Sequence, residues 1–597
     1  MSDIKSIYGE MAFNDQTMQD RLPKPVYKTL VQTIKKGDPL DPEIANAVAH
    51  AMKEWAIEKG ATHYTHWFQP LTGITSEKHD SFISPQEDGS TLLSFSGKEL
   101  IQGEPDASSF PTGGLRATFE ARGYTAWDPT SCVFIKDEVL CIPTAFVSYT
   151  GEALDKKTPL LRSMDAIDRE AKRVLRLFGR DPEHVTTTLG AEQEYFLIKE
   201  EDYAKRYDLI LTGRTLFGAE PCKGQELEEH YFGSIRPNVN RFMIELDNEL
   251  WRLGVPANTK HNEVAPGQHE LAPIFTNTNV AVDENLLTME LMRKLAPQQG
   301  LVCLQHEKPF AGINGSGKHN NWSINSNGYN LLDPGKTPFD NLQFLVFLTS
   351  VIKAVDEYQG LLRMSVATAG NDHRLGSHEA PPAIVSIFLG DELESIVHDI
   401  IDSKPHPAAE DAVMDLGVTV IPTFIKDNTD RNRTSPFAFT GNKFEFRMPG
   451  SEINLADTNT VLNTIVASAL SDFADAMESV SDEDFDRAVR SHLKQILIKH
   501  QRIIFNGDGY GQDWTEEAER RGLLNLKTAP EAIQQIVTEK SISLFEKFHV
   551  LSRIEIQSRY EVKLDHYAKK LNLEGRTSAR LASREYLPAI IEYSNTL

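Results

Sequence analysis

Closely spaced glutamates occur on a segment that alternates polar and apolar residues. Glu192 and Glu194 lie two apart in VTTTLGAEQEYFLI (185–198), so a β-strand would place both on one face, together with Phe196. Two carboxylates on one face repel each other unless a cation or water lies between them. A single pair of this kind is explained as well by a solvated sheet face as by a binding site.

Three further segments have the same character. His319 opens an alternating run, HNNWSIN, and KFEFR (443–447) sets three ionic groups against two phenylalanines. In HNEVAPGQHE (261–270), the Pro-Gly pair marks a turn that can fold two glutamates toward one point. Four such segments, each backed by bulky apolar residues, fit a ligand-lined cavity in an antiparallel sheet better than four unrelated solvated faces.

The ligand set of this cavity would contain five glutamates and one histidine. Oxygen-rich sets without cysteine suit Mg²⁺ or Mn²⁺. Five carboxylates would overcharge a single divalent ion, so we expect two or three ions. Divalent ions beside arginine and lysine are the machinery of phosphoryl transfer. The pattern therefore predicts a metal-dependent enzyme that uses ATP. The ligands are Glu192, Glu194, Glu263, Glu270, Glu445 and His319, and the positive residues are Arg374, Arg433, Lys443 and Arg447.

The Gly-rich run GINGSGKH (312–319) nearly matches a phosphate-binding P-loop. A P-loop needs GxxxxGK followed by Ser or Thr, and then a helix whose N-terminus faces the phosphate. Here His319 follows the lysine, and the next residues have the period of a strand. Two hypotheses follow: a P-loop variant with a helix beginning at Lys318, or a Gly-rich turn that delivers a histidine onto a sheet face.

The composition limits the partners and the compartment. The 597-residue chain is 40% hydrophobic and 25% charged, as in ordinary globular proteins. Its net charge of −24 argues against nucleic acid or an anionic membrane as the main partner. The four cysteines show no CxxC spacing and are too sparse for a disulfide framework. We find no apolar leader-like region at the N-terminus and no 18-residue apolar run, so we expect a cytoplasmic protein.

Helices and short strands must position these residues. Residues 1–60 have helical patterns, with Asp41-Pro42 as a start signal and Gly60 as a stop. Short β-like runs follow from about 65 to 150. Helices over 160–178 and 239–253 flank the strand-like segments, and the chain beyond about 455 is helical in pattern except at NGDGYGQDW (506–514). That run resembles a calcium loop imperfectly, so we predict a turn.

Two other features have only weak functional signals. His63 and His66 lie beside aromatic residues, and we interpret them as structural histidines because no carboxylate partner is close in the sequence. The segment SGKELIQGEPDASSFPTGG (96–114) is rich in Gly, Pro and Ser, so we expect an irregular loop that could reach another surface.

Taken together, the quoted segments resemble the glutamine synthetase family. GAEQEYFL resembles its G-x-E-x-E-F/Y strand, HNEVAPGQHE its H-x-E-V-(x)-G-Q-x-E segment, and NGSGKH its N-G-S-G-x-H loop. RLGSHEAP is similar to its flap, NRTSP to its Asn-Arg element and KFEFRMP to its R/K-x-E-x-R-x-P strand. They occur in the family's order across about 190–450. The N-terminal extension, the HYTHWFQPLTG run and the helical C-terminal region are similar to the large, third class of the family.

The resemblance implies a reaction and a role for each ligand. Similar enzymes phosphorylate the side-chain carboxylate of glutamate with ATP, and ammonia then displaces phosphate from the γ-glutamyl phosphate. By this resemblance, a first ion would be bound by Glu194, Glu263 and Glu270. A second ion, bridging the nucleotide phosphates, would be bound by Glu192, His319 and Glu445.

The resemblance also implies the substrate-binding residues. Catalytic roles fall to Glu379, a flap residue that would take a proton from ammonium, and to Arg374. The family's ammonium-site aspartate follows Phe, but here Ser96 follows Phe95, and we assign Asp106 as a substitute. The remaining assignments are Asn314, Gly315, Arg374 and Arg447 for glutamate, and Ser323, Arg433, Lys443 and Asn321 for ATP, with Asn321 standing where the family has a second histidine.

The expected fold class is α+β, with an antiparallel sheet lining the site. We expect a helical extension over 1–60, a β-grasp-like domain over 61–155, a catalytic α/β domain over 156–470 and a helical region over 471–597. The resemblance implies homo-oligomeric hexameric rings stacked into a dodecamer, with the site between neighbouring subunits. It offers no counterpart of an adenylylated tyrosine loop, and members of the large class often extend further at the C-terminus.

Two alternatives keep this fold. One is a ligase that joins glutamate to an amine rather than to ammonia, and the other is a catalytically inactive structural relative. Retention of all six candidate ligands favours a catalyst, and Arg374 and Glu379 favour ammonia as the acceptor.

Overall fold

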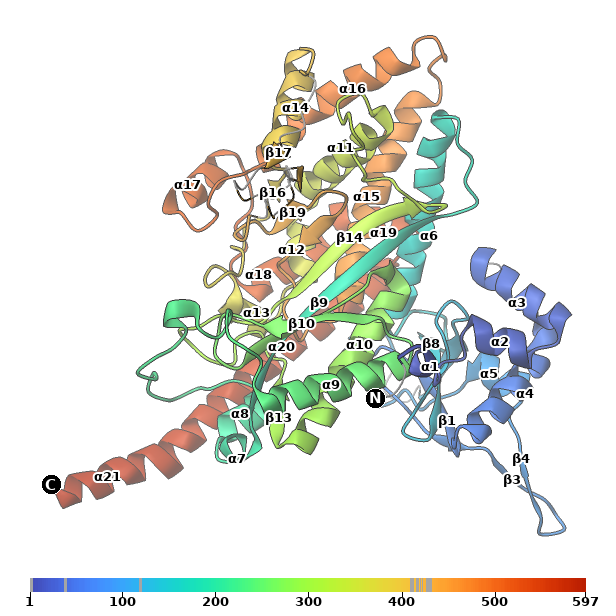
Figure 1. Ribbon diagram of the computed structural model, residues 1–597, viewed down its shortest axis with the longest axis vertical. Helices are drawn as coiled ribbons and strands as arrows, with labels where there is room; N and C mark the ends of the chain where they lie inside the picture. Colours follow the sequence, from blue (N-terminus) through green and yellow to red (C-terminus); the bar gives the residue numbers. More distant parts are fainter. Residues whose placement is uncertain are drawn as a thin grey trace.

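The computed structural model describes residues 4–36, 40–116, 121–407, 413–414, 418, 420, 422, 424–425 and 432–597. It has an α+β fold, with a small N-terminal sheet, a larger central sheet and helices packed around both (Figure 1). The expected fold class is therefore confirmed.

Helices form the N-terminal part of the chain, as predicted. Asp41 caps α4 (Pro42–Glu58), because its side chain accepts a hydrogen bond of 2.9 Å from the backbone N–H of Glu43. Gly60, at φ +93°, ends the helix in a backbone conformation that favours glycine. The preceding helices are α1 (Ile4–Ile7), α2 (Asp15–Arg21) and α3 (Lys24–Lys36).

The smaller sheet follows these helices. Its strand order is β2-β1-β8-β6-β5, with β7 paired to β8, and β1 runs parallel to β8. A separate hairpin, β3–β4, projects from this part of the molecule (Figure 1). The strands are β1 (His63–Trp67), β2 (Asp80–Ser81), β3 (Ile83–Pro85), β4 (Thr91–Leu93), β5 (Gln102–Gly103), β6 (Gly123–Trp127), β7 (Phe134–Lys136) and β8 (Val139–Ser148).

The prediction of an irregular loop over 96–114 is wrong at its start. Residues Gly97–Ile101 form helix α5, followed directly by β5. Ser96 and Glu99 form a capping box, in which the Ser96 hydroxyl accepts from the N–H of Glu99 and the Glu99 carboxylate accepts from the N–H of Ser96 at 2.6 Å. These reciprocal bonds satisfy two backbone donors, and they outweigh the loop-like composition.

The larger sheet has ten strands within the described part of the chain. Its order is β10-β11-β9-β14-β20-β19-β16, with β12 and β13 also paired to β9 and β15 to β14, and only β16 and β19 pair in parallel. The strands are β9 (Val185–Lys199), β10 (Ala257–Asn262), β11 (Gln268–Pro273), β12 (Thr276–Asn277), β13 (Leu301–Leu304), β14 (Lys318–Ser326), β15 (Tyr329–Asn330), β16 (Ile387–Phe388), β19 (Phe437–Phe439) and β20 (Phe444–Phe446).

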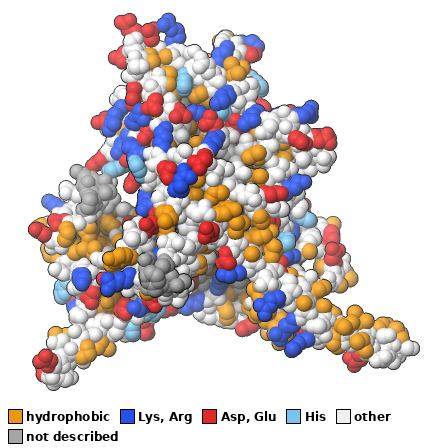
Figure 2. All heavy atoms as spheres, turned by 180° about the vertical axis from the view of Figure 1, so that it is seen from behind, with side chains coloured by type: hydrophobic (Ala, Val, Ile, Leu, Met, Phe, Trp, Pro, Cys, Tyr) orange, Lys and Arg blue, Asp and Glu red, His pale blue; other side chains and the backbone are white. Residues whose placement is uncertain are grey.

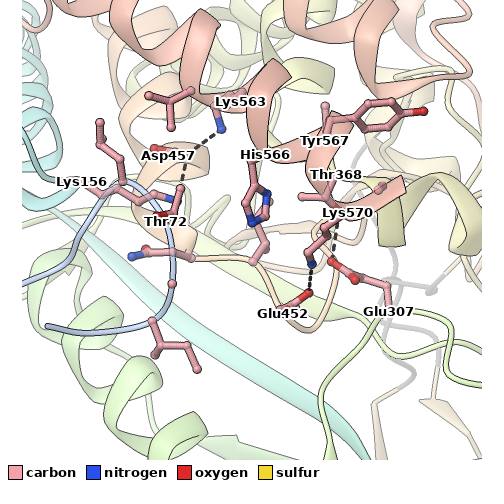
Figure 3. A pocket seen from close by; sticks show the side chains of 18 of the residues that line it. Thr72, Lys156, Glu307, Thr368, Glu452, Asp457, Lys563, His566, Tyr567 and Lys570 are labelled. Atoms are coloured by element: carbon pink, nitrogen blue, oxygen red, sulfur yellow. Dashed lines mark hydrogen bonds and ion pairs between the residues drawn. The ribbon is translucent and has the colours of Figure 1, made fainter. Parts of the chain in front are cut away.

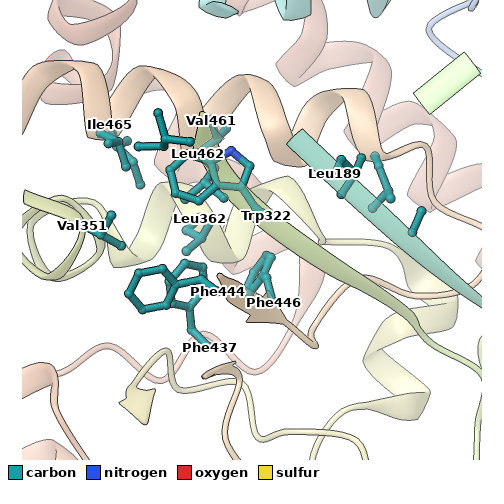
Figure 4. Packing of buried hydrophobic residues seen from close by; sticks show 14 of the residues in the cluster. Leu189, Trp322, Val351, Leu362, Phe437, Phe444, Phe446, Val461, Leu462 and Ile465 are labelled. Carbon is teal, nitrogen blue, oxygen red and sulfur yellow. The ribbon is translucent and has the colours of Figure 1, made fainter. Parts of the chain in front are cut away.

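The apolar face of the central strands packs against helices. Trp322 of β14 is fully buried, and its indole N–H donates to Asn463 of α15 at 3.0 Å. Figure 4 shows Trp322 beside Val461 and Leu462, with Phe444 on the neighbouring strand. Burying each such side chain contributes roughly 1.5–3 kcal/mol. The helices of this part include α6 (Lys157–Leu177), α9 (Pro237–Arg252), α10 (Thr278–Leu295), α11 (Leu342–Glu357), α12 (Gln359–Ser365), α13 (Ala369–Arg374), α14 (Asp391–Asp402) and α15 (Leu455–Met477).

The C-terminal region is helical apart from its connecting turns, and α20 (Arg553–Leu581) crosses back over the molecule. Its Arg559 donates to the carbonyl oxygen of Asp155 at 2.7 Å, close to the end of the smaller sheet. The last helix, α21 (Leu587–Thr596), projects outward with exposed apolar side chains (Figures 1 and 2). No helix in the described ranges has both the length and the apolar character needed to cross a bilayer. The other helices here are α16 (Phe485–His500), α17 (Gln512–Arg520), α18 (Ala529–Ile533) and α19 (Glu539–Lys547).

Candidate active site

A cavity of about 170 Å³ lies on the polar face of the central sheet. It collects twelve of the sixteen residues named from the sequence, together with Tyr231, His261, His378 and Ala380. The twelve are Glu192, Glu194, Glu263, Glu270, Asn314, Gly315, His319, Arg374, Glu379, Arg433, Glu445 and Arg447.

Strand register brings the acidic residues together. Glu194 of β9 lies opposite Glu270 of β11, and Glu192 lies opposite His319 of β14. Glu445 of β20 stands one strand further along, opposite Asn321. Because side chains directly opposite each other have Cβ atoms about 4.5–5.5 Å apart, these pairings crowd carboxylates onto one face. The strand that begins at Lys318 also excludes the P-loop hypothesis, which needs a helix there.

His319 lies at the centre of the acidic cluster. Its Nδ1 atom is 2.8 Å from a Glu192 oxygen and 3.4 Å from a Glu445 oxygen, and its Nε2 atom is 3.8 Å from Glu194. Burial and the nearby Arg447 oppose protonation of this imidazole. The hydrogen bond to Glu192 and the charges of the glutamates outweigh them and raise the pKa of His319 to about 9.

Glu263 is held in a strongly acidic environment. Burial, followed by repulsion from Glu194 and Glu270, raises the pKa of Glu263 to about 8. Burial also raises the pKa of Glu270, against a hydrogen bond of 3.0 Å from His261. Carboxylates that resist ionisation in this way mark a place where positive charge is missing.

Three groups of side chains have ligand atoms close enough to bind an ion. Within each group, one ligand atom from every residue lies within 4.8 Å of the others. Each group offers carboxylate oxygens and one imidazole, a ligand set that fits hard divalent cations such as Mg²⁺ or Mn²⁺. The groups are Glu192–His319–Glu445, Glu194–Glu270–His319 and His261–Glu263–Glu270, of which His261 was not anticipated as a ligand.

Arginines form the other side of the cavity. Arg447 is 7% exposed, and its Nη1 atom is 3.3 Å from Glu445, while its buried Nε–H has no hydrogen-bond partner among the described residues. A buried donor without a partner costs about 1–3 kcal/mol. An oxyanion in the cavity would supply the missing acceptor, which makes Arg447 a strong candidate for contact with a carboxylate or phosphate.

Backbone carbonyls fix the position of Arg374. Its guanidinium donates to the carbonyl oxygens of Arg447, Met448 and Pro449 at 3.1–3.2 Å. A Cβ atom on Gly317 would lie 2.2 Å from Nη2 of Arg374, so only glycine fits beside the guanidinium. The Gly-rich turn therefore gives the arginine room.

Glu379 closes one side of the cavity. Its two carboxylate oxygens accept hydrogen bonds of 2.7 Å from Arg433 and 3.1 Å from Asn314. His378 and Glu379 have φ values of +52° and +65°, which are rare for residues other than glycine. Strained backbone of this kind concentrates at active sites and flaps. The flap segment thus connects the Gly-rich turn to the Asn-Arg element.

Four of the named residues do not line the cavity. Asn321 donates to Glu192 at 2.9 Å, and Ser323 donates to Asn330 and to the carbonyl oxygen of Asn442. Lys443 precedes β20 without contributing to the lining. Asp106 is exposed on the smaller sheet's side of the molecule, where it accepts from the N–H of Ser108 at 2.9 Å.

The C-terminal loop over 506–511 contacts the residues on either side of Arg433, which sequence reasoning missed. Asn432 donates to the carbonyl oxygen of Gly507 at 2.7 Å, and the N–H of Gly509 donates to Thr434 at 2.8 Å. Burial raises the pKa of Tyr510 to about 12, opposed by the charges of Arg447 and Arg374. The NGDGYG run was the available signal, but its likeness to a calcium loop obscured it.

Comparison with known proteins gives a consistent result. Three family models match the chain: "Glutamine synthetase type III N terminal" over residues 4–163, "Glutamine synthetase, catalytic domain" over 169–367 and "Glutamine synthetase C-terminal domain" over 488–597. A "Type-3 glutamine synthetase" of Dictyostelium discoideum is 50% identical, and a "Glutamine synthetase" of Bacteroides fragilis is 49% identical. Each alignment covers 100% of this chain and 82% of the relative.

A solved structure described as "Apo GmaS without ligand" is similar in fold. Its TM-score is 0.51 at 15% sequence identity, with 87% of this chain and 95% of that chain covered. At this level of identity, the likeness concerns the fold alone.

Proposed function

The chain belongs to the type III glutamine synthetases, and we propose that it joins ammonia to the side-chain carboxylate of glutamate with the use of ATP. The observation that carries the proposal is a single cavity with acids on one side and Arg374, Arg433 and Arg447 on the other. Such a cavity can hold divalent ions and oxyanions together, as phosphoryl transfer to a carboxylate requires.

The proposed reaction has two steps. An oxygen of the glutamate side-chain carboxylate attacks the terminal phosphorus of ATP, so that ADP leaves and γ-glutamyl phosphate forms. Ammonia then attacks the acyl carbon, the C–O bond to phosphate breaks, and glutamine and phosphate are released. Glu379 takes the proton that ammonium must lose before its nitrogen can attack, and its contacts with Arg433 and Asn314 keep the flap closed against water.

Each substrate group has a proposed binding residue. Arg447, with its unpartnered buried Nε–H, would bind the glutamate together with Arg374, Asn314 and Gly315. The ATP phosphates would meet Arg433 and Lys443, while Ser323 and Asn321, which lie further along β14, would contact the nucleotide. Of these, Asn321 acts through Glu192, to which it donates a hydrogen bond.

The acidic side is proposed to hold two or three Mg²⁺ or Mn²⁺ ions. Glu194, Glu263 and Glu270 would hold one, with His261 beside them, and Glu192, His319 and Glu445 would hold another. Bound there, the ions supply positive charge to the phosphate oxygens. The raised pKa values of Glu263 and Glu270 support this assignment, because both carboxyls need a cation to ionise fully.

The oligomeric state and location are also proposals. Asp106 does not line this chain's own cavity, so its proposed ammonium role requires a neighbouring copy, as in stacked hexameric rings. Native mass measurement tests this arrangement, and a fully active monomer would contradict it. Cytoplasmic location and the domain boundaries near 60, 155 and 470 stay predictions.

An activity assay distinguishes the proposal from its alternatives. We expect ADP and glutamine to appear in equal amounts with glutamate, ATP, ammonium and Mg²⁺ or Mn²⁺. Release of ADP with an amine but not with ammonium would favour the amine-ligase alternative. Absence of ADP release together with absence of Mn²⁺ binding would favour the inactive relative.

A further inference from the structure

A second cavity of about 230 Å³ lies between the C-terminal helix α20 and the rest of the chain (Figure 3). It shares no lining residue with the candidate active site. Its walls come from the loop over 71–74, the linker at Lys156, helix α10, the segment that leads into α15, and α20. Clefts where separate parts of a chain meet are common ligand sites, and drug-sized ligands occupy about 300–1,000 Å³. This cavity suits a smaller metabolite.

Basic side chains outnumber acidic ones in this cavity. Three acid–base contacts are internal: Asp457 is 2.8 Å from Lys563 and 3.4 Å from Lys156, and Glu452 pairs with Lys570. Figure 3 shows these side chains around one space, with His566 between the two groups. Three lysines therefore share two carboxylates.

Arg293 adds a further cation to the same wall. Its side chain is exposed and has no hydrogen bond or ion pair with any other residue that the structure describes. With the three lysines it brings the basic side chains to four, against the carboxylates of Glu452 and Asp457. Burial lowers the pKa of His566 to about 4, so this imidazole is neutral near pH 7 and free to donate one hydrogen bond.

Glu307 is the third acid of the cavity and does not reverse its charge. It is 1% exposed, one carboxyl oxygen accepts from Thr368 at 3.1 Å, and the other has no hydrogen-bond partner in the part of the chain that the structure describes. Burial, then the charge of Glu452, raises the pKa of Glu307. With Glu307 charged or neutral, four cations against two or three carboxylates leave the cavity positive.

We propose that this cavity binds a small dianion, either a dicarboxylate or a phosphate-bearing metabolite. Two negative charges would complement Arg293 and the shared lysines, and His566 would donate a hydrogen bond to an anionic oxygen. The formal excess of positive charge, to which the unpartnered Arg293 contributes, is the observation behind the choice of ligand class.

Glu307 connects this cavity to the active site. Its backbone oxygen accepts from the N–H of Ser316 at 2.8 Å, in the Gly-rich turn that carries Asn314 and Gly315. Its carboxylate accepts from Thr368, the N-cap residue of α13, which ends at Arg374. A ligand bound beside Glu307 therefore affects two segments assigned to glutamate. This coupling rests on the proposed function, whereas binding itself does not.

Calorimetric titration of the full chain with succinate, and separately with inorganic phosphate, tests the binding. Arg293→Gln removes the unpaired cation without leaving a carboxylate alone, so we expect at least a tenfold weaker Kd for the bound probe. Lys569→Gln is the matched control, because Lys569 neighbours Lys570 but is 74% exposed and pairs with Asp565, outside the cavity. Its Kd should equal that of the wild type.

Each outcome of the titrations has a definite meaning. If only succinate binds, and Arg293→Gln weakens that binding, the cavity is a dicarboxylate site. If only phosphate binds in this way, the cavity is a phosphate site. If neither probe binds, the proposal is overturned. It is also overturned if a probe binds with the same Kd in Arg293→Gln as in the wild type, because that probe then occupies another site.

The coupling has its own readout. With the cavity saturated by its probe, the KM for glutamate should shift at least threefold in the wild type and stay constant in Arg293→Gln. An unchanged KM in a wild type that demonstrably binds the probe removes the coupling and leaves the binding site intact. Absence of glutamine synthesis by the wild type would instead count against the proposed function, whether or not the cavity binds its probe.

Discussion

Gly317→Ala provides a sharp test of how the Gly-rich turn positions the arginine side of the site. A Cβ atom there would lie 2.2 Å from Nη2 and 2.8 Å from Cζ of Arg374. Real Cβ contacts stay beyond 3.0 Å, so the guanidinium or the turn must move by at least 0.8 Å, the difference between 3.0 and 2.2. The guanidinium cannot retreat freely, since it donates to the carbonyl oxygens of Met448 and Pro449.

Misplacing a group in an active site by about 1 Å can cost about 100-fold in rate, or roughly 2.7 kcal/mol. We therefore expect kcat/KM for glutamate to fall about 100-fold in Gly317→Ala, with the metal sites still able to bind Mn²⁺. Initial rates of ADP formation at varied glutamate measure this, and Tm shows whether the variant folds.

Gly190→Ala is the control for this test. Gly190 lies in the same sheet, but its added Cβ would meet Phe275 at 3.5 Å, an ordinary contact. It should keep kcat/KM within about threefold of the wild type. A Gly317→Ala enzyme that matched the control would refute the idea that the turn holds Arg374 in place.

Three further predictions concern the metal site, the C-terminal loop and pH. Glu445→Gln should weaken Mn²⁺ binding, measured by calorimetry, by more than the ~10–100-fold typical of an outer-shell partner; unchanged affinity would exclude Glu445 as a ligand. Asn432→Ala breaks the hydrogen bond between Asn432, which is next to Arg433, and Gly507. A net loss near 1.4 kcal/mol would lower kcat/KM for ATP about tenfold. Unchanged initial rates at varied ATP would show that the loop does not support the site. Burial raises the pKa of Glu284 to about 8 from an ordinary 4.5, so the folded state keeps a proton that the unfolded state loses. The free energy of unfolding should therefore fall between pH 5 and 8 by on the order of 1–3 kcal/mol, and Glu284→Gln should raise Tm more at pH 8 than at pH 5; equal shifts at both pH values would contradict this.

The metal side of the cavity was predictable because strands have a period of two. Glu192 and Glu194 must share a face wherever a strand forms, and the Pro-Gly turn brings Glu270 back beside them. Helix α4 was predictable for a similar reason, since Asp41 and Gly60 are local signals that act within a few residues. Patterns of this kind need no knowledge of distant contacts.

The remaining features depend on contacts between distant segments. Nothing near Gly317 in the sequence indicates that Arg374 packs against it, and the contact of Asn432 with Gly507 spans 75 residues. His261 was treated only as part of a turn, yet the register of β10 and β11 places it opposite Glu270. Helix α5 had a local signal in Ser96 and Glu99, but the weight given to Gly and Pro hid it.

The most direct test of the central claim uses glutamate labelled with ¹⁸O in its side-chain carboxylate. If that carboxylate attacks ATP and ammonia then displaces phosphate, one labelled oxygen must pass from glutamate into the released phosphate. Mass spectrometry of the phosphate after turnover with ATP, ammonium and Mg²⁺ measures this transfer. We predict one ¹⁸O per phosphate for each glutamine formed. Glutamine formed together with unlabelled phosphate would contradict the acyl-phosphate route.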